Sequence, residues 1–418
     1  MRTPVVVIGA GQAGLAMSHH LTGRAIDHIV LDRGEVAQSW RTERWDSLRL
    51  LTPNWMSRLP GYRYRGDDPD GFMTKDDTIA FLDDYGRSFG APVRTHVTVE
   101  EVRLRGSGFE VTTDAGVWSC DAVVAATGAS SEPRRPAVAA DLPGRIDQLT
   151  ALQYRNPDQL ADGEVLVVGA SASGVQIADE LRRSGRHVTV AVGEHVRLPR
   201  RYRGHDIHWW LDAVGHLDER YEEVDDIDRA RRLPSLQLVG SSRPRTLDLN
   251  TLIAAGVEVV GRFMRVAGTR AQFSGALAHL VANADLKLNR LLARIDEFAL
   301  EHGLDAELTE ATRPPATAVG TVPTELDLGR FATVIWATGY RPSFPWLDRA
   351  AFDQRGRLVH DGGAGALPGL YVLGLPFLRR RKSSFIDGVG PDAAELAGHL
   401  HAHLDRRVPP AARITRAG

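Results

Sequence analysis

A pattern of apolar strand, glycine turn and helix occurs twice in this chain of 418 residues, and it constrains the fold more than any other feature. The first copy covers residues 5–21 and the second covers residues 165–184. A second apolar strand follows each helical stretch, at His28–Asp32 and at Val188–Val192. A buried strand that leads through a tight turn into a helix, and then into another strand, is the unit from which parallel sheets are built. The sequence therefore predicts an α/β fold.

Two further apolar strands indicate how the two copies are arranged along the chain. Both Ala122–Gly128 and Thr333–Gly339 end in Ala-Thr-Gly, and proline-containing segments that are typical of crossover linkers follow each of them. We read both strands as closing the first domain. We therefore expect residues 160–328, with a long helix near Ala276–Ala299, to form a domain inserted into one made of residues 1–159 and 329–418.

The first glycine motif is complete at the level of the sequence. Gly9 permits the tight turn, Gly11 lets a pyrophosphate approach the backbone, and Gly14 allows the helix and the strand to pack closely. The amide groups at the N-terminus of the following helix supply a positive end for the phosphates. Asp32 lies 18 residues after Gly14, at the end of the second strand, where it is placed to accept ribose hydroxyls. The alternative, a purely structural glycine turn, leaves Asp32 unexplained.

The second motif departs from this pattern at its middle position. Gly169 and Gly174 match the outer glycines, whereas Ser171 replaces the central one and Ser173 follows it. A serine still permits a fairly close approach, so we expect pyrophosphate binding to persist. No acid ends the second strand, and arginines at 197, 200 and 201 lie downstream. Arginines are the residues that a 2′-phosphate requires, so NADPH is favoured over NADH, although a solvated basic loop is the competing interpretation for each arginine.

The composition excludes several classes of function. The chain has 51 Lys+Arg against 53 Asp+Glu, so a nucleic-acid partner is not expected. Cys120 is the single cysteine, which excludes a two-cysteine redox centre and suits a reducing, cytoplasmic location. No run of 18 apolar residues and no metal-ligand spacing of histidines is present, so neither a membrane span nor a metal site is expected.

The chain resembles the flavin-containing monooxygenases, also called class B flavoprotein monooxygenases, which are two-domain flavoproteins similar to glutathione reductase. The resemblance covers nearly the whole sequence. The segments that carry it, besides the two glycine motifs, are Trp40-Arg41 with Leu48–Pro53, Tyr154–Pro157, Ala337–Tyr340, Gly369–Gly374 and Gly388–Ala394. The resemblance implies an FAD domain that contains an inserted NAD(P)H domain.

The resemblance, together with the two motifs, also assigns cofactor-binding residues. In the last segment, a helix N-terminus is expected to face the flavin and to stabilise its anionic reduced form. The predicted cofactor-binding residues are Gly9, Gly11, Gly14, Asp32, Arg33, Trp40, Arg41, Thr52, Thr127, Gly128, Gly169, Ser171, Ser173, Gly174, Arg197, Arg200, Arg201, Thr338, Gly339, Tyr340, Gly388, Gly390 and Asp392.

One family feature is missing. The family fingerprint places a histidine between a glycine and a tyrosine, but counting back from Tyr154 reaches Thr150, and counting forward from Gly144 reaches Gln148. No catalytic side chain is therefore assigned.

The function implied by the resemblance is that of a monooxygenase. In such an enzyme NADPH reduces FAD, the reduced flavin and O2 form a C4a-(hydro)peroxide, and one oxygen atom passes to a small organic substrate, by N/S oxidation or a Baeyer–Villiger reaction. The alternatives are an FAD/NAD(P)H reductase or dehydrogenase without oxygen insertion, and a nucleotide-binding sensor. A homodimer is the oligomeric state that the resemblance suggests.

Overall fold

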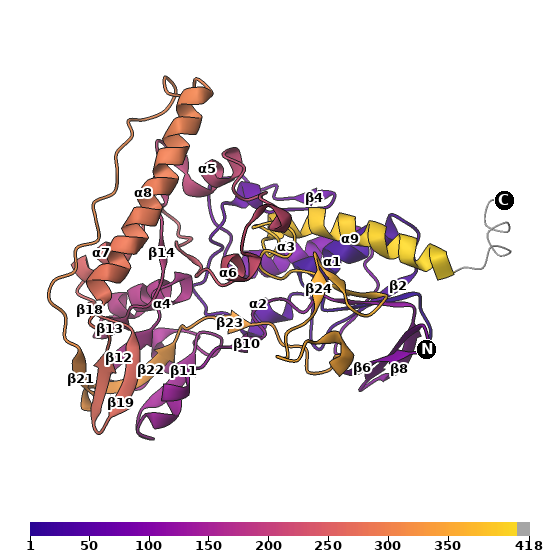
Figure 1. The fold of residues 1–418 in the computed structure, drawn as a ribbon, viewed down its shortest axis with the longest axis horizontal. Coiled ribbons are helices and arrows are strands. Elements are labelled where there is room, and N and C mark those ends of the chain that lie inside the picture. Colours follow the sequence, from indigo (N-terminus) through magenta and orange to yellow (C-terminus); the bar gives the residue numbers. More distant parts are fainter. Residues whose placement is uncertain (408–418) are drawn as a thin grey trace.

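The computed structural model describes residues 1–407, so the last part of the predicted range 329–418 lies outside the described residues. Two sheets form the centres of the two halves in Figure 1: the second is parallel, and the first is parallel except for the antiparallel strands β24 and β25 at one edge. The first sheet has seven strands in the order β24 (His360–Asp361), β25 (Ala364–Gly365), β26 (Leu370–Val372), β9 (Ala122–Ala125), β1 (Val5–Ile8), β2 (His28–Leu31) and β5 (Val93–Arg94). The second has five strands in the order β11 (Asp147–Thr150), β22 (Phe331–Trp336), β12 (Glu164–Val168), β13 (Val188–Ala191) and β18 (Glu258–Val260).

The helices are distributed between the two halves of the molecule. The first half contains α1 (Gln12–Thr22), α2 (Gln38–Thr42), α3 (Lys75–Ser88) and α9 (Ile386–Arg407). The second contains α4 (Ala172–Arg183), α5 (Ile207–Ala213), α6 (Ile227–Arg231), α7 (Leu249–Ala254) and α8 (Leu277–Glu301). The long helix expected near 276–299 is confirmed as α8, which rises at the outer edge of the second half in Figure 1.

Smaller sheets and ribbons complete the fold. One three-stranded sheet contains β6 (Val99–Arg105), β7 (Gly108–Thr113) and β8 (Gly116–Cys120), and another contains β19 (Phe263–Ala267), β20 (Arg270–Phe273) and β21 (Glu325–Asp327). Two-stranded ribbons are formed by β3 (Arg58–Leu59) with β4 (Tyr62–Arg63) and by β10 (Glu132–Pro133) with β23 (Tyr340–Arg341). Two more are formed by β14 (Val196–Arg197) with β17 (Leu236–Gln237) and by β15 (Arg201–Tyr202) with β16 (His205–Asp206).

Hydrophobic burial explains why the glycine motifs are preceded by strands. Every residue of β1 is buried, and so are the last four residues of β12, which is the pattern of parallel strands with both faces covered. β1 lies between β2 and β9 in parallel register, and β12 lies between β13 and β22 in the same way. The two halves are therefore built on the same strand–helix–strand plan, as the repeat predicted.

One detail of the expected organisation is wrong. The segment Thr333–Ala337 was expected to close the first domain, but β22 pairs with β12 in the second sheet. β11 also joins that sheet, although residues 147–150 lie before the expected boundary. β26 occupies the position next to β9 in the first sheet. The apolar strand β22 therefore pairs in the second sheet. We propose that the inserted unit extends from β11 to β22, beyond 160–328 at both ends.

The two chain crossings between the halves run side by side. β10 pairs antiparallel with β23, so Pro133 lies opposite Tyr340 and Glu132 lies opposite Arg341. Arg341 also forms an ion pair with Glu132 at 2.8 Å. Of the prolines expected to mark crossover linkers, Pro133 lies in this two-stranded ribbon, which joins the halves (Figure 1), and Pro136, Pro342 and Pro345 follow its two strands.

Candidate dinucleotide-binding sites

The first glycine turn has the geometry that its sequence predicts. Gly9 adopts a positive φ of 107°, and a Cβ there would lie 2.6 Å from the carbonyl oxygen of Ala126. A Cβ on Gly14 would overlap the carbonyl oxygen of Gly9. Both positions therefore require glycine, because the turn and the helix approach the neighbouring backbone too closely for any side chain.

Gly11 is different, and the difference marks the ligand side of the turn. A Cβ on Gly11 would have no protein atom within 4 Å, and its backbone is extended, with φ −85° and ψ −172°. Gly11 is the N-cap of α1 and makes no side-chain cap, so the amides of the first turn are directed at this open space. The protein itself does not need a glycine here, but a phosphate group approaching those amides does.

Asp32 connects this turn to the second strand. Its carboxylate accepts hydrogen bonds from the amide of Ala10 at 2.7 Å and from the amide of Gly34 at 3.0 Å. Burial outweighs these two hydrogen bonds and raises the pKa of Asp32 above its usual value. The carboxylate is thus fixed at the tip of β2, next to the turn, with lone pairs left to accept ribose hydroxyls.

The backbone of the second glycine turn has nearly the same conformation as that of the first. Gly169 has φ 113°, and a Cβ on Gly174 would overlap the carbonyl oxygen of Gly169. Ser171 has φ −86° and ψ −173°, within about 1° of Gly11, and it is the N-cap of α4 without a side-chain cap. Because this backbone is open to every residue type, serine fits the place of the central glycine without strain.

The alanine–threonine–glycine segments lie beside the two turns. Ala126 approaches Gly9, and Ala337 approaches Gly169, in the same manner. The residues after them, Thr127 with Gly128 and Thr338 with Gly339, therefore lie next to the candidate cofactor spaces, and both glycines have positive φ. The Thr338 hydroxyl donates to the carbonyl of Arg134 in the linker ribbon.

Tyr340 connects the linker ribbon to the second turn. Its hydroxyl lies 3.4 Å from the Oγ of Ser173, in the first turn of α4. Tyr340 and Trp40, both partly buried, pack against the same apolar cluster of the second half. The guanidinium of Arg44 lies 5.6 Å from the Trp40 ring, and burial lowers the pKa of Arg44. The predicted residues Trp40, Ser173 and Tyr340 are thus gathered where the two halves meet.

The terminal segment comes to the first glycine turn, as the resemblance implied, but through residues that sequence reasoning missed. A Cβ on Gly374 would lie 2.8 Å from the Cβ of Ala13 in α1, and Gln12 donates to the carbonyl of Ser384 at 3.4 Å. The signal for Gly374 was present in the sequence, because it ends the apolar strand Leu370–Leu373 as Gly9 ends β1. Nothing in the sequence singled out Gln12 or Ser384.

Three residues predicted at the end of the FAD site make close contacts within the protein. A Cβ on Gly388 would overlap the carbonyl oxygen of Lys382, and a Cβ on Gly390 would lie 3.2 Å from Pro60. Asp392 is fully buried and pairs with Arg380 at 2.7 Å. Since the side chain of Asp392 reaches no open space, we do not retain it as a cofactor contact.

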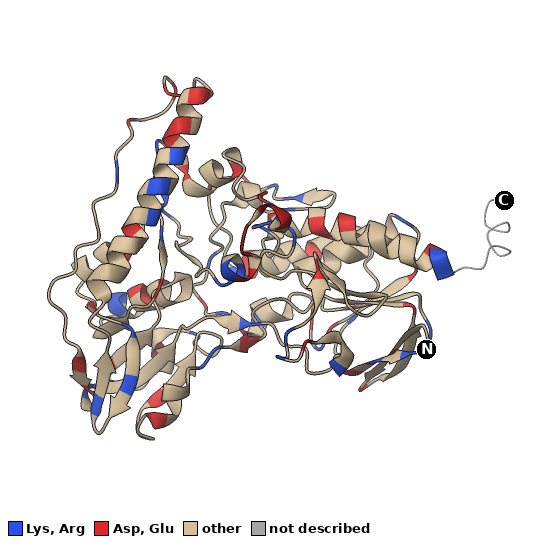
Figure 2. Ribbon diagram, viewed as in Figure 1, with Lys and Arg blue, Asp and Glu red and all other residues tan. Residues whose placement is uncertain are grey.

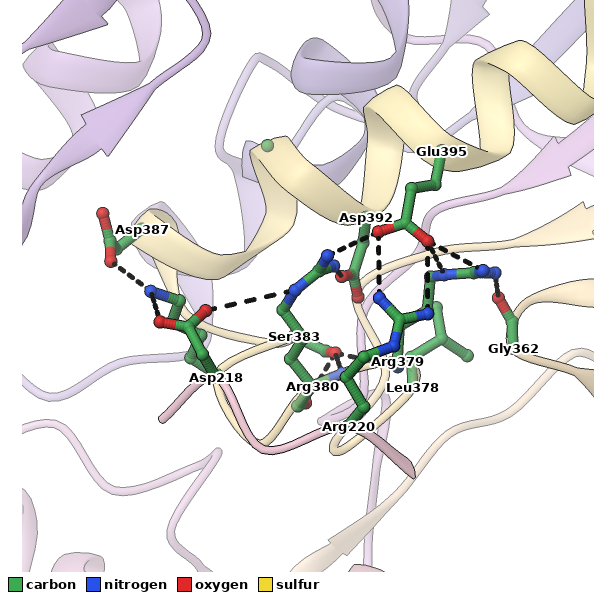
Figure 3. A network of polar contacts seen from close by, with 12 residues as sticks. Asp218, Arg220, Gly362, Leu378, Arg379, Arg380, Ser383, Asp387, Asp392 and Glu395 are labelled. Atoms are coloured by element: carbon green, nitrogen blue, oxygen red, sulfur yellow. Dashed lines mark hydrogen bonds and ion pairs between the residues drawn. The ribbon is translucent and has the colours of Figure 1, made fainter. Parts of the chain in front are cut away.

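The basic run Arg379–Lys382 is paired with acids within the protein, and Figure 3 shows Arg379 and Arg380 beside Asp392 and Glu395. Arg379 and Arg380 both pair with Glu395 on α9, at 2.9 and 2.5 Å. Arg381 pairs with Glu219, and Lys382 pairs with Asp218 at 3.0 Å. We call this set of ion pairs the interdomain clamp, because Asp218 and Glu219 belong to the inserted unit.

The arginines proposed for a 2′-phosphate are mostly engaged elsewhere. Arg197 is buried and pairs with Asp248 and Asp285. Arg200 is 1% exposed, pairs with Asp206 at 2.6 Å and donates to the carbonyl of Leu51 at 2.8 Å, which ties the inserted unit to the first half. These two assignments are corrected, because an arginine with buried carboxylate partners is not free to meet a phosphate.

The remaining predicted residues lie at the surface. Arg201 is exposed in the β15–β16 hairpin and donates to the carbonyl of Gly204. Arg33 pairs with Glu43, and Arg41 pairs with Asp83 at 2.6 Å. Thr52 is partly buried in the segment that precedes β3.

Cys120, the single cysteine, is buried at the end of β8. Burial is the main cause that raises its pKa to about 12, so its thiol stays protonated near neutral pH. Cys120 is thus a residue of the hydrophobic core.

An open cavity of about 590 Å³ lies where a loop of the first half meets α5. Trp55 and Trp209 line it, and His205 stacks on Trp209 with ring centroids 4.2 Å apart. In the structure Trp210 is the core residue, fully buried, whereas Trp209 remains partly exposed.

Figure 2 shows both signs of charge interspersed over the described chain. Within residues 1–407, no helix combines the length and apolar character needed to cross a membrane.

The comparisons with known proteins agree with this architecture. A family model described as pyridine nucleotide-disulphide oxidoreductase matches residues 6–214, half of the chain. An uncharacterised CzcO-like oxidoreductase of Geobacillus kaustophilus is 31% identical, over 96% of this chain and 98% of its own length. An indole-3-pyruvate monooxygenase of Oryza sativa subsp. japonica is 27% identical, over 96% of this chain and 92% of its own length.

Among solved structures, a flavin-containing monooxygenase from Stenotrophomonas maltophilia shares the fold. It has a TM-score of 0.66 at 22% identity, and the match covers 96% of this chain and 99% of that one. The two glycine turns, the sheet order and these relatives together show that the chain belongs to the pyridine nucleotide-disulphide oxidoreductase family.

Proposed function

We propose that this protein is an FAD- and NADPH-dependent monooxygenase that transfers one oxygen atom from O2 to a small organic substrate. The observation that carries the proposal is the pair of matching turns, each with an open central position at a helix N-terminus. Two dinucleotide sites in one chain are what a hydride transfer from a nicotinamide to a flavin requires. Relatives named as monooxygenases cover nearly the whole chain.

The residues present fit both cofactors. Gly11 and the first turn of α1 would hold the FAD pyrophosphate, Asp32 would accept its ribose hydroxyls, and Gly374 would bring the terminal segment against the same turn. Ser171 and the first turn of α4 would hold the pyrophosphate of NADPH. When bound, the flavin supplies hydride acceptance and reaction with O2, chemistry that no side chain provides.

The contribution of this chain is to orient the two sites and to exclude water between them. Arg200 and the interdomain clamp join the halves through ion pairs and hydrogen bonds. A Cβ on Gly240 of the inserted unit would overlap the carbonyl oxygen of Leu50, so the two halves touch backbone to backbone there. A fixed junction of this kind would limit the access of water to a flavin bound beside it.

The family histidine is absent from its expected place, and the structure shows what replaces it. The side chain of Gln148 accepts a hydrogen bond from the Trp336 indole at 3.0 Å, and Thr150 is buried in β11, where its hydroxyl donates to Gln153. Both are structural residues of the second sheet. The proposed activity therefore relies on the cofactor and its surroundings and on no proton carrier at these positions.

Product analysis tests the proposal directly. The purified protein is incubated with NADPH, 18O2 and a panel that contains a thioether, a tertiary amine and a ketone. A monooxygenase incorporates one 18O atom into at least one product, with NADPH consumed in proportion. NADPH oxidation that yields only H2O2 with every substrate, together with fast reduction of a quinone, would instead identify the alternative, a reductase or dehydrogenase.

The proposal includes a homodimer in the cytoplasm. Light scattering coupled to size-exclusion chromatography measures the first, with about twice the chain mass of 45.7 kDa expected. The second rests on the single buried cysteine, which suits a reducing compartment.

A further inference from the structure

The internal repeat of this chain allows the nucleotide-binding positions of its two halves to be compared residue by residue. In the first half Val5 pairs with His28, and in the second Val165 pairs with Val188. The amide of Gly9 donates to Leu31, and the amide of Gly169 donates to Ala191, the residue in the corresponding place. Asp32, the next residue after Leu31, therefore corresponds to Val192.

This correspondence extends to the third strand. Asp32 donates its amide to the carbonyl of Arg94 in β5, and Val192 donates its amide to the carbonyl of Val260 in β18. Asp32, whose carboxylate is proposed to bind a ribose in the first half, is thus replaced in the second half by Val192, which is apolar and fully buried. A nucleotide whose ribose carries two free hydroxyls finds no acceptor at Val192, and one with a negative group on the ribose meets no repulsion there.

The side chain that lies at this place is Arg262. It follows β18 by two residues, and its Nε lies 3.8 Å from where a Cβ on Gly193 would stand. Arg262 is exposed, and within residues 1–407 its guanidinium forms no ion pair or hydrogen bond. It differs in this from Arg197 and Arg200, whose charges are satisfied by buried carboxylates.

The surroundings of Gly193 support an anion at this point. Gly193 is held by His195, whose Nδ1 donates to the Gly193 carbonyl at 3.0 Å, and burial lowers the pKa of that imidazole. Glu194 is the one acid in this turn, and Lys287 of α8 lies 3.6 Å from its carboxylate. Glu194 thus has a cation beside it, and Arg262 stands beside a glycine at which a Cβ would meet no protein atom other than Arg262 itself.

We infer that Arg262 binds the 2′-phosphate of NADPH and sets the preference of the inserted unit for NADPH over NADH, an inference that rests on the proposed function. The carboxyl ends of β13 and β18 form the edge at which a nucleotide bound to the α4 turn places its adenosine ribose. A guanidinium there meets the 2′-phosphate with two parallel hydrogen bonds, and it has no comparable partner in NADH.

Equilibrium binding to the holoenzyme tests this without any turnover. Isothermal titration compares adenosine 2′,5′-bisphosphate with 5′-AMP, two probes that differ only in the 2′-phosphate. Wild type is expected to prefer the bisphosphate, and Arg262→Gln is expected to lose about ten- to a hundredfold in bisphosphate affinity, the range for a charge-assisted hydrogen bond, with 5′-AMP unchanged. Arg270→Gln is the control, because Arg270 is an exposed arginine of the adjoining β20.

A second variant adds charge instead of removing it. Gly193 does not have a positive φ, and a Cβ there meets only the Arg262 side chain, so Gly193→Asp fits the fold. Its carboxylate would pair with Arg262, and the same selective loss of bisphosphate affinity is expected. Equal affinity of wild type and Arg262→Gln for the bisphosphate, or equal losses for both probes, would overturn the inference. Failure of wild type to bind either probe would instead count against the nicotinamide site of the proposed function.

Discussion

At the scale of single residues, the outer positions of the two turns are set by the fold, whereas the protein leaves the central positions open. A Cβ on Gly14 overlaps backbone, whereas a Cβ on Gly11 meets open space. We expect Gly11→Val to yield folded protein that retains little FAD, because the side chain fills the phosphate approach. Gly14→Ala should destabilise the chain itself. Flavin content per protein and the melting temperature of the FAD-free forms separate the two effects, and full flavin content in Gly11→Val would contradict the assignment.

Ser171 provides the converse test in the second turn. Its backbone conformation matches that of Gly11, and it makes no cap hydrogen bond that glycine would lose. Ser171→Gly should therefore change the affinity for adenosine 2′,5′-bisphosphate by less than about threefold and stability by only a few tenths of a kcal/mol. A loss of tenfold or more in titration would show that the hydroxyl itself binds the nucleotide.

The sequence identified site residues best where the backbone geometry or the ligand chemistry demands one particular residue type. Gly9, Gly14 and Asp32 could be assigned because a positive φ, a close contact and a carboxylate each leave a residue-type signature. Arg197 and Arg200 could not, because a sequence shows the presence of an arginine and not the carboxylates that neutralise it. Asp248 and Asp285, the partners of Arg197, lie 51 and 88 residues away in the chain.

At the scale of elements, the segment before α9 is held by charge. Burial alone would raise the pKa of Glu395, but hydrogen bonds from Arg220 and Arg380, and the charge of Arg379, outweigh it and lower the pKa to about 2. A lowered pKa means that the ionised form stabilises the fold. This contribution is complete above the unfolded value of about 4.5 and is lost as the pH falls toward 2.

We predict that Glu395→Gln lowers the free energy of unfolding near pH 7 by about 1–2 kcal/mol. This is less than the pKa shift alone would give, because water screens the partly exposed side chain. The difference in melting temperature from wild type should shrink below pH 4.5. Glu100→Gln, at an exposed acid of β6, is the matched control. A difference that does not vary between pH 7 and pH 3 would show that the ion pairs of the interdomain clamp do not stabilise the fold.

The elements also show where sequence patterns were ambiguous. The strands at Ala122 and Thr333 carry the same Ala-Thr-Gly ending, and both were assigned to the first domain. The sequence of an apolar strand does not indicate which sheet it joins, because its pairing depends on which sheet has a free edge strand. In the first sheet, the strand beside β9 is β26, which lies far along the chain. β22 pairs instead with β12 in the second sheet.

At the scale of the whole molecule, the structure is one design used twice and joined by a ribbon and the interdomain clamp. The halves differ at one chemically decisive place: Asp32 in the first corresponds to Val192 in the second, with Arg262 nearby. Under the inference made above, that difference would suit the second half to a ribose that carries a phosphate. The shared plan was readable from the sequence, whereas the register that pairs Asp32 with Val192 required the strands to be seen.

The central claim is that NADPH bound in the second half reduces a flavin in the first, and that the reduced flavin then reacts with O2 to oxygenate a substrate. Stopped-flow absorbance with two sequential mixes measures this most directly. Anaerobic NADPH should bleach the flavin fully, and O2 added next should give a transient absorbing species, distinct from the oxidised and reduced spectra, that decays faster when an oxygenated substrate is formed. Flavin that stays oxidised under anaerobic NADPH, or reoxidises in one phase with stoichiometric H2O2 at all times, would contradict the account.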